Sequence, residues 1–201
     1  METNWEQRLQ RLEDREAIRD CLSRYSRGVD RLDRELLISA YHPDAIDDHG
    51  KFIGSPEDFA DWAFAMHSAA HLAHQHAIFN QFVELDGDTA HAESYFMFVG
   101  VNREGPPVSM SGGRYIDRFE KRAGVWGIAT RLCIRDWALS DHRLDLDDLS
   151  SFTATSQLLS PEIRQFMNGG PKPRRDERDP SYLRPLEVSL ERRAQWRALG
   201  G

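Results

Sequence analysis

Three clusters of turn-forming residues recur at regular intervals between residues 74 and 138 and separate segments of similar length. They are Asp86-Gly87-Asp88, Glu104-Gly105-Pro106-Pro107 and Arg122-Ala123-Gly124. Glycine, proline and aspartate favour the backbone angles of tight turns, and the segments between them alternate in polarity as strands do. The pattern therefore predicts consecutive antiparallel strands near residues 74–85, 89–101, 108–121 and 125–138.

Helical periodicity precedes this series of strands. A first helix is predicted over Glu6–Val29, where apolar residues recur every three or four positions, at Leu9, Leu12, Ile18, Leu22 and Tyr25. A second is predicted over Arg34–Tyr41 and ends at Pro43, because the residue before proline avoids the helical region. A third begins after Ser55, an N-cap residue followed by proline, and runs to about Met66. Helices followed by an antiparallel sheet indicate an α+β fold.

Length and charge limit the classes of function. A chain of 201 residues fits one domain with an appendage, here 1–139 followed by a partly helical extension, 140–201, with a helix from Pro161 to Met167. We expect that extension to dock on its own or a neighbouring subunit. The net charge of −7 argues against a nucleic-acid-binding surface. No apolar run is long enough to cross a bilayer and no signal peptide is evident, so we expect no membrane partner and a cytoplasmic location.

Five short motifs carry a resemblance to a known family. They are Tyr25-Ser-Arg-Gly-Val-Asp30; Tyr41-His-Pro-Asp-Ala45; His76-Ala-Ile-Phe-Asn80 leading into Glu84-Leu-Asp-Gly-Asp88; Gly113-Arg-Tyr-Ile-Asp-Arg-Phe119; and Gly124-Val-Trp-Gly-Ile128 followed by Arg131. In this order they resemble the SnoaL-like branch of the NTF2-like superfamily, similar to scytalone dehydratase, bile-acid 7α-dehydratase and hexachlorocyclohexane dehydrochlorinase. The resemblance covers roughly residues 10–139. It implies a cone-shaped α+β barrel in which a curved antiparallel sheet and three N-terminal helices surround a pocket.

The resemblance also implies a catalytic site. Asp30 and His76 match the aspartate and histidine of the dehydratase and dehydrochlorinase members, and a carboxylate on one ring nitrogen would orient an imidazole as a base. Arg131 matches a position that can carry a cavity-facing arginine, suited to a leaving group or enolate. Tyr25 matches a proton donor, but it could share a pocket with Asp30 only if the helix unwound near Gly28.

Each of these residues also has a structural interpretation. Asp30 could cap a helix or pair with a nearby arginine, His76 could be an ordinary half-buried strand histidine, and Arg131 could face solvent. Tyr25 could pack in the core, and Asn80 could form a hydrogen bond with the backbone as readily as with a ligand. Asp44 and Asp47 are interpreted as loop acids.

Four histidines, His67, His71, His74 and His76, are spaced closely enough to suggest a metal site. No acidic residue lies between Met66 and Ile78 and no H-E-x-x-H motif is present, so we predict no metal and no cofactor. In this interpretation His71 and His74 contact substrate at the pocket mouth.

The sequence therefore favours a cofactor-independent lyase, of dehydratase, dehydrohalogenase or C–C lyase type, acting on a hydrophobic cyclic or aromatic small molecule. His76 would be the base, Asp30 its orienter, and Arg131 and Tyr25 the stabilising groups. The apolar wall is predicted to comprise Phe52, Trp62, Met66, Phe79, Phe96, Phe98 and Met110. A polyketide cyclase or ketosteroid-isomerase-like proton shuttle and a non-catalytic binding protein are the alternatives. Apolar residues on both strand faces predict a homotrimer or, failing that, a homodimer.

Overall fold

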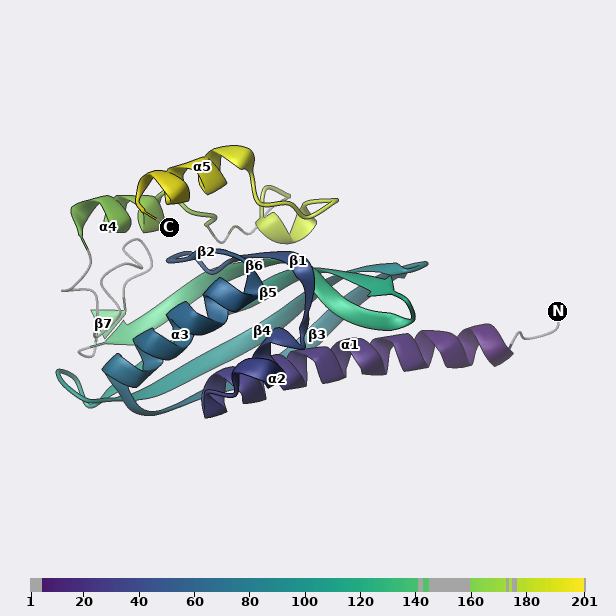
Figure 1. The fold of residues 1–201 in the computed structure, drawn as a ribbon, viewed down its shortest axis with the longest axis horizontal. Coiled ribbons are helices and arrows are strands. Elements are labelled where there is room, and N and C mark those ends of the chain that lie inside the picture. The colour runs from purple at the N-terminus through teal and green to yellow at the C-terminus, as the bar shows by residue number, and fades with distance from the viewer. Residues whose placement is uncertain (1–4, 141–142, 145–159, 173, 175–176, 201) are drawn as a thin grey trace.

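The computed structural model describes residues 5–140, 143–144, 160–172, 174 and 177–200. Figure 1 shows a long curved sheet, with α1 along one side and α4 and α5 beyond the opposite side. The order of elements confirms the α+β class. They are α1 (Trp5–Arg31), α2 (Arg34–Ile38), β1 (Tyr41–Asp48), β2 (Ile53–Gly54), α3 (Pro56–Ala70), β3 (His71–Asp86), β4 (Thr89–Asn102), β5 (Val108–Arg122), β6 (Val125–Ser140), β7 (Arg143–Leu144), α4 (Pro161–Asn168), the 3₁₀ helix η3 (Pro180–Tyr182) and α5 (Leu190–Ala198).

The sheet has the strand order β2-β1-β6-β5-β4-β3, with β7 paired to β6. Strands β3 to β6 form the antiparallel series predicted from the turn clusters. β1 adds to this series in the parallel direction beside β6, so the sheet is mixed rather than wholly antiparallel. A parallel neighbour comes from a distant part of the sequence and leaves no turn signal between the two strands.

The core lies between this sheet and the first and third helices. The buried residues of α1, including Ile18, Leu22, Tyr25 and Val29, recur at helical spacing and pack with apolar residues of the strands. The earlier apolar positions Leu9 and Leu12 do not pack there and are exposed, because α1 extends beyond the edge of the sheet (Figure 1).

The second helix is shorter than predicted. It ends at Ile38, and Tyr41–Asp48 forms the strand β1, with Pro43 inside it. Proline cannot donate a backbone hydrogen bond, but the register with β6 shifts between Tyr41 and Ile46, so this stretch of β1 needs no regular ladder. The third helix begins as predicted: the Ser55 hydroxyl accepts from the Asp58 N–H at 3.2 Å.

The described part of the C-terminal extension packs on the sheet of the same chain. Leu186 is buried against Ile116, Leu132 and Ile134. The Arg114 guanidinium binds Asp179 of the extension in a bidentate manner, at 2.8 and 3.0 Å. The apolar residues Phe152, Leu158 and Leu159, which we predicted to dock, lie outside the described residues.

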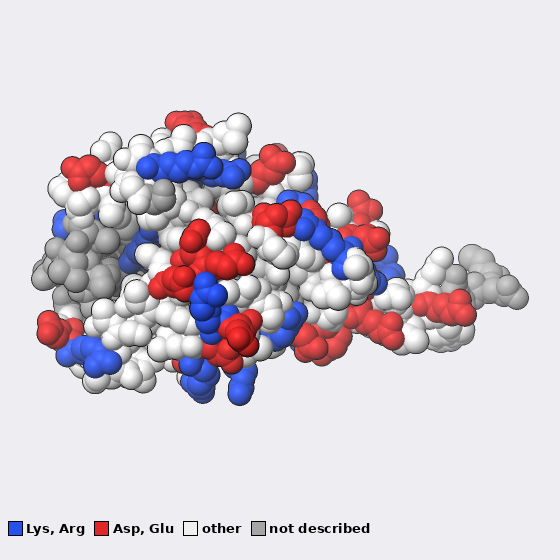
Figure 2. Space-filling model, in the orientation of Figure 1, with Lys and Arg blue, Asp and Glu red and all other residues white. Residues whose placement is uncertain are grey.

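Charged side chains are distributed over the surface. Figure 2 shows acidic and basic side chains interspersed on one face of the molecule. Arg34 of α2 pairs with Asp61 of α3 at 2.7 Å, in an exposed position where such a pair contributes little. Within the described ranges, no helix is long and apolar enough to cross a membrane.

A buried ion pair joins α5 to the end of β1. Arg192 Nε lies 2.5 Å from Asp48 Oδ2, and a second guanidinium nitrogen donates to the Gly50 carbonyl at 3.1 Å.

Arg192→Met would leave the Asp48 carboxylate buried without a counter-charge, so we expect a loss of about 3–5 kcal/mol in the free energy of unfolding. Urea denaturation measures it. The exposed Arg197→Met is the control, and equal stability of the two variants would contradict the prediction.

Candidate active site

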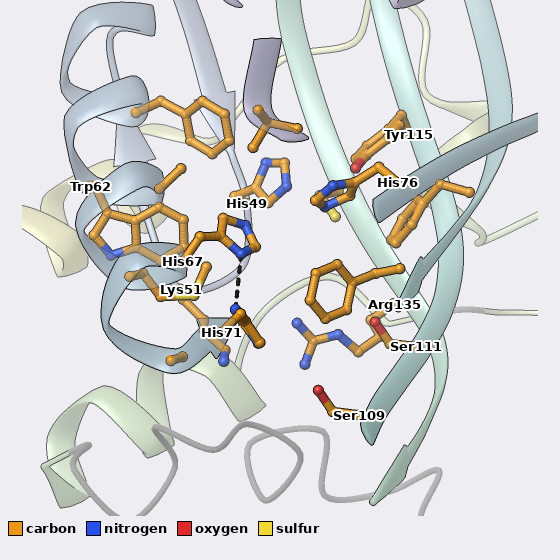
Figure 3. A pocket seen from close by; sticks show the side chains of 18 of the residues that line it. His49, Lys51, Trp62, His67, His71, His76, Ser109, Ser111, Tyr115 and Arg135 are labelled. Atoms are coloured by element: carbon orange, nitrogen blue, oxygen red, sulfur yellow. Dashed lines mark hydrogen bonds between the residues drawn. The ribbon is translucent and has the colours of Figure 1, made fainter. Parts of the chain in front are cut away.

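A cavity lies between the sheet and helices α1 and α3, and its lining combines aromatic rings with titratable side chains. In Figure 3 its side chains project from α3, from the turn after β1 and from the strands toward a common space. Among the residues proposed from the sequence, those that line it are Tyr25, Trp62, Met66, His71, His76, Phe96, Phe98 and Met110.

Asp30 and His76 are in direct contact. His76 Nδ1 lies 2.8 Å from Asp30 Oδ1, and the backbone N–H of His76 donates to both carboxylate oxygens at 3.0 Å. The carboxylate can only accept, so Nδ1 carries the proton and Nε2 keeps its lone pair when the ring is neutral. The side chains of His76 and Asp30 are only 8% and 10% exposed. The pair is therefore a fixed imidazole whose second nitrogen can accept a proton.

Burial lowers the pKa of His76, and the hydrogen bond and charge of Asp30 offset this only in part. Desolvation disfavours the imidazolium form, whereas a carboxylate favours it. His76 is consequently neutral near pH 7, which is the state a base requires.

The end of α1 sets the position of Asp30. The helix remains intact to Arg31, and Leu32 then takes a positive φ of 54°. A Cβ on Gly28 would lie 2.6 Å from the backbone nitrogen of Leu37, so glycine permits the close packing of α1 on α2. The helix does not unwind near Gly28, which was the condition for Tyr25 and Asp30 to face one pocket. Tyr25 lines the cavity, whereas Asp30 contacts His76 without lining it.

A second carboxylate–imidazole pair was not predicted. Asp47 was interpreted as a loop acid, but it lies on β1, is fully buried, and its Oδ1 is 2.7 Å from His49 Nδ1. Asp47 Oδ2 also accepts from the Tyr41 hydroxyl at 2.5 Å. The Tyr25 hydroxyl lies 3.5 Å from His49 Nε2 and 3.4 Å from the Tyr115 hydroxyl.

The environment of His49 raises its pKa, whereas that of His76 lowers its pKa. Burial alone would lower the pKa of His49, but the surrounding groups, including Tyr25 and the Asp47 carboxylate, raise it well above its usual value. Burial raises the pKa of Tyr25 and of Tyr115. Both phenols are therefore neutral near pH 7, and the Asp47 carboxylate on Nδ1 is the charge that favours the protonated form of His49.

Arg131 does not face the cavity, contrary to the sequence-based prediction. It is fully buried, and its guanidinium binds the cross-strand Asp117 with two hydrogen bonds of 2.8 Å. The guanidinium carbon lies 4.1 Å from the ring centroids of both Tyr25 and Tyr115. Arg131 thus lies beneath the tyrosines and supports them by cation–π contact.

Three more predicted residues lie away from the cavity. Phe52 is buried among the aromatic rings of the core instead of lining the pocket. Phe79 and Asn80 are exposed, because the pairing of β3 with β4 shifts register between Ile78 and Gln81. A bulge changes which face the following side chains occupy, so simple alternation from His76 gave the wrong face for Asn80.

The other histidines form a buried group beside His76. His67 Nδ1 and His71 Nδ1 are 3.2 Å apart, and the rings of His67 and His74 stack at 4.0 Å. His74 does not line the cavity: its Nε2 donates to the Val29 carbonyl at 3.0 Å. Burial and the neighbouring imidazoles lower the pKa of His67 strongly and that of His71 to about 4.

This group could hold a metal ion. The ligand atoms of His67, His71 and His74 lie within 4.8 Å of one another, as do those of Asp30, His74 and His76. The second set contains Asp30 and His76, which a hydrogen bond between Asp30 Oδ1 and His76 Nδ1 already joins. A metal bound through those two atoms would replace the hydrogen bond that orients the base.

Sequence reasoning missed several polar residues of the lining. They are His49, Lys51, Tyr115 and Arg135. Tyr115 belonged to one of the family motifs, and alternation from Arg131 already placed Arg135 on the same strand face. His49 and Lys51 lie in the turn between β1 and β2, and since β1 was not predicted the turn was not either.

Comparisons with known proteins agree with this architecture. A type 2 hexachlorocyclohexane dehydrochlorinase, LinA, superposes with a TM-score of 0.61 at 25% identity, over 66% of this chain and 93% of that one. A protein from Novosphingobium aromaticivorans, provisionally named a scytalone dehydratase, gives 0.59 at 18% identity, over 66% and 91%. A variant of Rv3472, a protein of unknown function from Mycobacterium tuberculosis, gives 0.60 at 19%, over 78% and 95%. Comparison with curated protein sequences gives no match.

The sequence itself matches one family model, that of the SnoaL-like domain, over residues 10–132. This range contains Asp30, His76 and the strands that form the cavity, and it leaves out the C-terminal extension. The match spans more than half of the chain and confirms the resemblance found in the motifs. The chain belongs to the SnoaL-like domain family and has an NTF2-like fold.

Proposed function

We propose that this chain is a cofactor-independent lyase that removes a proton and a leaving group from a hydrophobic cyclic or aromatic small molecule. The observation that carries the proposal is the contact of 2.8 Å between Asp30 and His76, with the imidazole lining an aromatic cavity. A neutral imidazole with a carboxylate on its far nitrogen is a general base, because the carboxylate stabilises the imidazolium that forms.

In the proposed reaction, His76 Nε2 takes a proton from a carbon of the substrate. The electron pair of the C–H bond forms a C=C bond as the bond to the leaving group on the next carbon breaks. The leaving group departs with that bond's electrons, as hydroxide or halide. His49, whose protonated form Asp47 favours, can protonate it, and the hydroxyls of Tyr25 and Tyr115 can hydrogen-bond it.

This assignment changes the part that Arg131 plays. We proposed it from the sequence as the group that stabilises the leaving group, but it is bound to Asp117 beneath the tyrosine rings. Its role in the proposed mechanism is to position Tyr25 and Tyr115. The groups that would contact the departing atom are the two phenols and His49.

The tyrosine pair also favours a second candidate, a proton shuttle of the isomerase or cyclase type. Two neutral phenols with hydroxyls 3.4 Å apart can donate to a developing enolate oxygen. His76 would then return the proton to another carbon without elimination. Product mass separates the two reactions, because elimination lowers the mass of the substrate and isomerisation preserves it.

We also propose that the protein assembles as a homotrimer, with a homodimer as the alternative. Phe82 and Tyr95, on β3 and β4, are 62% and 47% exposed. The extension covers apolar residues of β5 and β6 instead, around Leu186. A neighbouring subunit would bury the exposed rings.

Substitutions of the paired residues test the proposed base. In a panel that measures chloride release from hexachlorocyclohexane and water loss from cyclic β-hydroxyketones, we expect His76→Gln to lower kcat/KM by roughly 10²–10⁴-fold. Asp30→Asn keeps the shape of the pair but removes its charge, so we expect it to lower kcat/KM by a smaller factor than His76→Gln. Gln75→Ala, on an exposed neighbouring position, is the control. If the panel gives turnover that survives His76→Gln, the assignment of the base is wrong.

The pH dependence follows from the lowered pKa of His76. Because burial disfavours its protonation, we expect kcat/KM to stay constant as the pH falls through 6.5 and to decline only at lower pH. The charge of Asp30 raises this pKa, so Asp30→Asn should move the midpoint further down. Imidazole resonances followed by NMR titration measure both midpoints. A His76 midpoint above 6.5 in the unsubstituted protein would refute the proposed protonation state.

Chelation tests the proposed independence from cofactors. The proposed base is organic, so we expect activity to be unchanged after exhaustive dialysis against EDTA. Loss of activity, restored by one divalent metal and abolished by His67→Gln, would instead assign the reaction to the histidine group.

A further inference from the structure

The cavity differs in charge from the chain that forms it. The chain carries 33 acidic and 26 basic residues, yet none of the described residues lining the cavity is aspartate or glutamate. The lining instead includes Lys51 and Arg135, together with histidines. A site that concentrates positive charge in an acidic protein selects for a negatively charged ligand.

The basic residues lie at one end of the cavity. Figure 3 shows Lys51, His71, Arg135, Ser109 and Ser111 toward one end, and His76 and Tyr115 toward the other. Lys51 and Arg135 are close enough for the charge of Arg135 to disfavour protonation of Lys51.

Lys51 has no counter-charge among the residues that the structure describes. The residue is 8% exposed, and no hydrogen bond or ion pair joins its amine to any residue in the described part of the chain. Burial, and then Arg135, lower its pKa well below the usual value. An ammonium group in such a place is costly unless an anion accompanies it. A ligand that brings the anion would remove this cost.

Hydrogen bonds on both sides hold the turn that carries Lys51. The Lys51 N–H donates to the His49 carbonyl at 2.9 Å, and Gly50 has a φ of +77°, a conformation that suits glycine. From outside the cavity, Arg192 of α5 holds the Gly50 carbonyl at 3.1 Å. The amine therefore extends into the cavity from a fixed backbone, as a binding group should.

An aromatic wall connects this end to the proposed base. The Phe98 ring lies 5.3 Å from the ring of His71 and 5.0 Å from that of His76. An apolar or aromatic group lying on Phe98 would reach from the basic end to His76. The ligand would need its charge on one side of this group and its reactive carbon on the other.

We propose that Lys51 and Arg135 form a carboxylate-binding subsite, so that the substrate is a hydrophobic or aromatic acid whose carboxylate lies at this end while its reacting carbon lies at His76. This inference rests on the proposed function and names its substrate class. The Lys51 ammonium would pair with the carboxylate as a point charge, and the Arg135 guanidinium adds a second positive charge at the same end of the cavity.

Matched ligands test the subsite without any turnover. 3-Phenylpropanoate and its neutral analogue 3-phenylpropanamide have nearly the same shape, and isothermal titration calorimetry measures the affinity for each. We expect the acid to bind the unsubstituted protein at least about tenfold more tightly than the amide. Lys51→Met should reduce this preference to about twofold or less and leave the affinity for the amide unchanged.

Further variants keep the test decisive. Lys172→Met makes the same change in net charge outside the cavity and should keep the preference for the acid. Lys51→Arg keeps the positive charge and should also keep it. If Lys51→Met does not fold, as judged by its melting curve, Lys51→Gln replaces it. His76→Gln should still prefer the acid, so loss of the proposed base and loss of the subsite give different results.

Three outcomes would overturn the inference. The first is equal affinity of the unsubstituted protein for acid and amide. The second is an equal loss of both affinities in Lys51→Met, which would assign Lys51 a structural role only. The third is a stable adduct on Lys51 after treatment with 3-phenylpropanal and borohydride, detected by peptide mass spectrometry. That adduct would identify Lys51 as an imine-forming nucleophile instead.

Discussion

The Arg131 guanidinium lies against the rings of both Tyr25 and Tyr115, and the arrangement of the cavity depends on this contact. Its charge is neutralised by Asp117 on the adjacent strand, through two hydrogen bonds of 2.8 Å. The remaining nitrogen, Nη1, has no hydrogen-bond partner in the described structure, and the two aromatic faces supply the attraction that compensates for this. The ion pair with Asp117 and the two aromatic contacts stabilise the buried cation, which thereby joins α1 to β5 and β6 at one point. The two phenol hydroxyls consequently meet at the cavity.

Two carboxylate–imidazole pairs with opposite protonation tendencies contact this cavity. The pKa of His76 is lowered because burial outweighs Asp30, whereas the pKa of His49 is raised because the groups around it outweigh burial. Environments that separate the pKa values of two similar groups are the means by which one site provides both a base and an acid near neutral pH. The same contrast supports the proposed reaction, in which one group removes a proton and another protonates the leaving group.

The sequence predicted what local patterns encode. Turn clusters located strands β3 to β6, Ser55 located the start of α3, and the motifs brought Asp30 and His76 together correctly. It did not predict what depends on long-range pairing. β1 joins β6 in parallel with no connecting turn, so the sequence analysis interpreted Asp47 as a loop acid and did not find His49. Asn80 is exposed because of a register shift in β3, and Arg131 binds the cross-strand Asp117 instead of facing the cavity. Alternation alone cannot reveal either effect, because both depend on the neighbouring strand.

The end of β1 couples the C-terminal extension to the cavity. Asp47 and Asp48 are consecutive and both are fully buried, and consecutive strand residues point to opposite faces. Asp47 therefore binds His49 on the cavity side, while Asp48 binds Arg192 of α5 on the other. The turn that follows carries His49 and Lys51, so its position is fixed from both faces at once. The family match ends at residue 132, and the similar dehydrochlorinase covers 66% of this chain. The extension thus supports the cavity from residues that lie outside the matched family model.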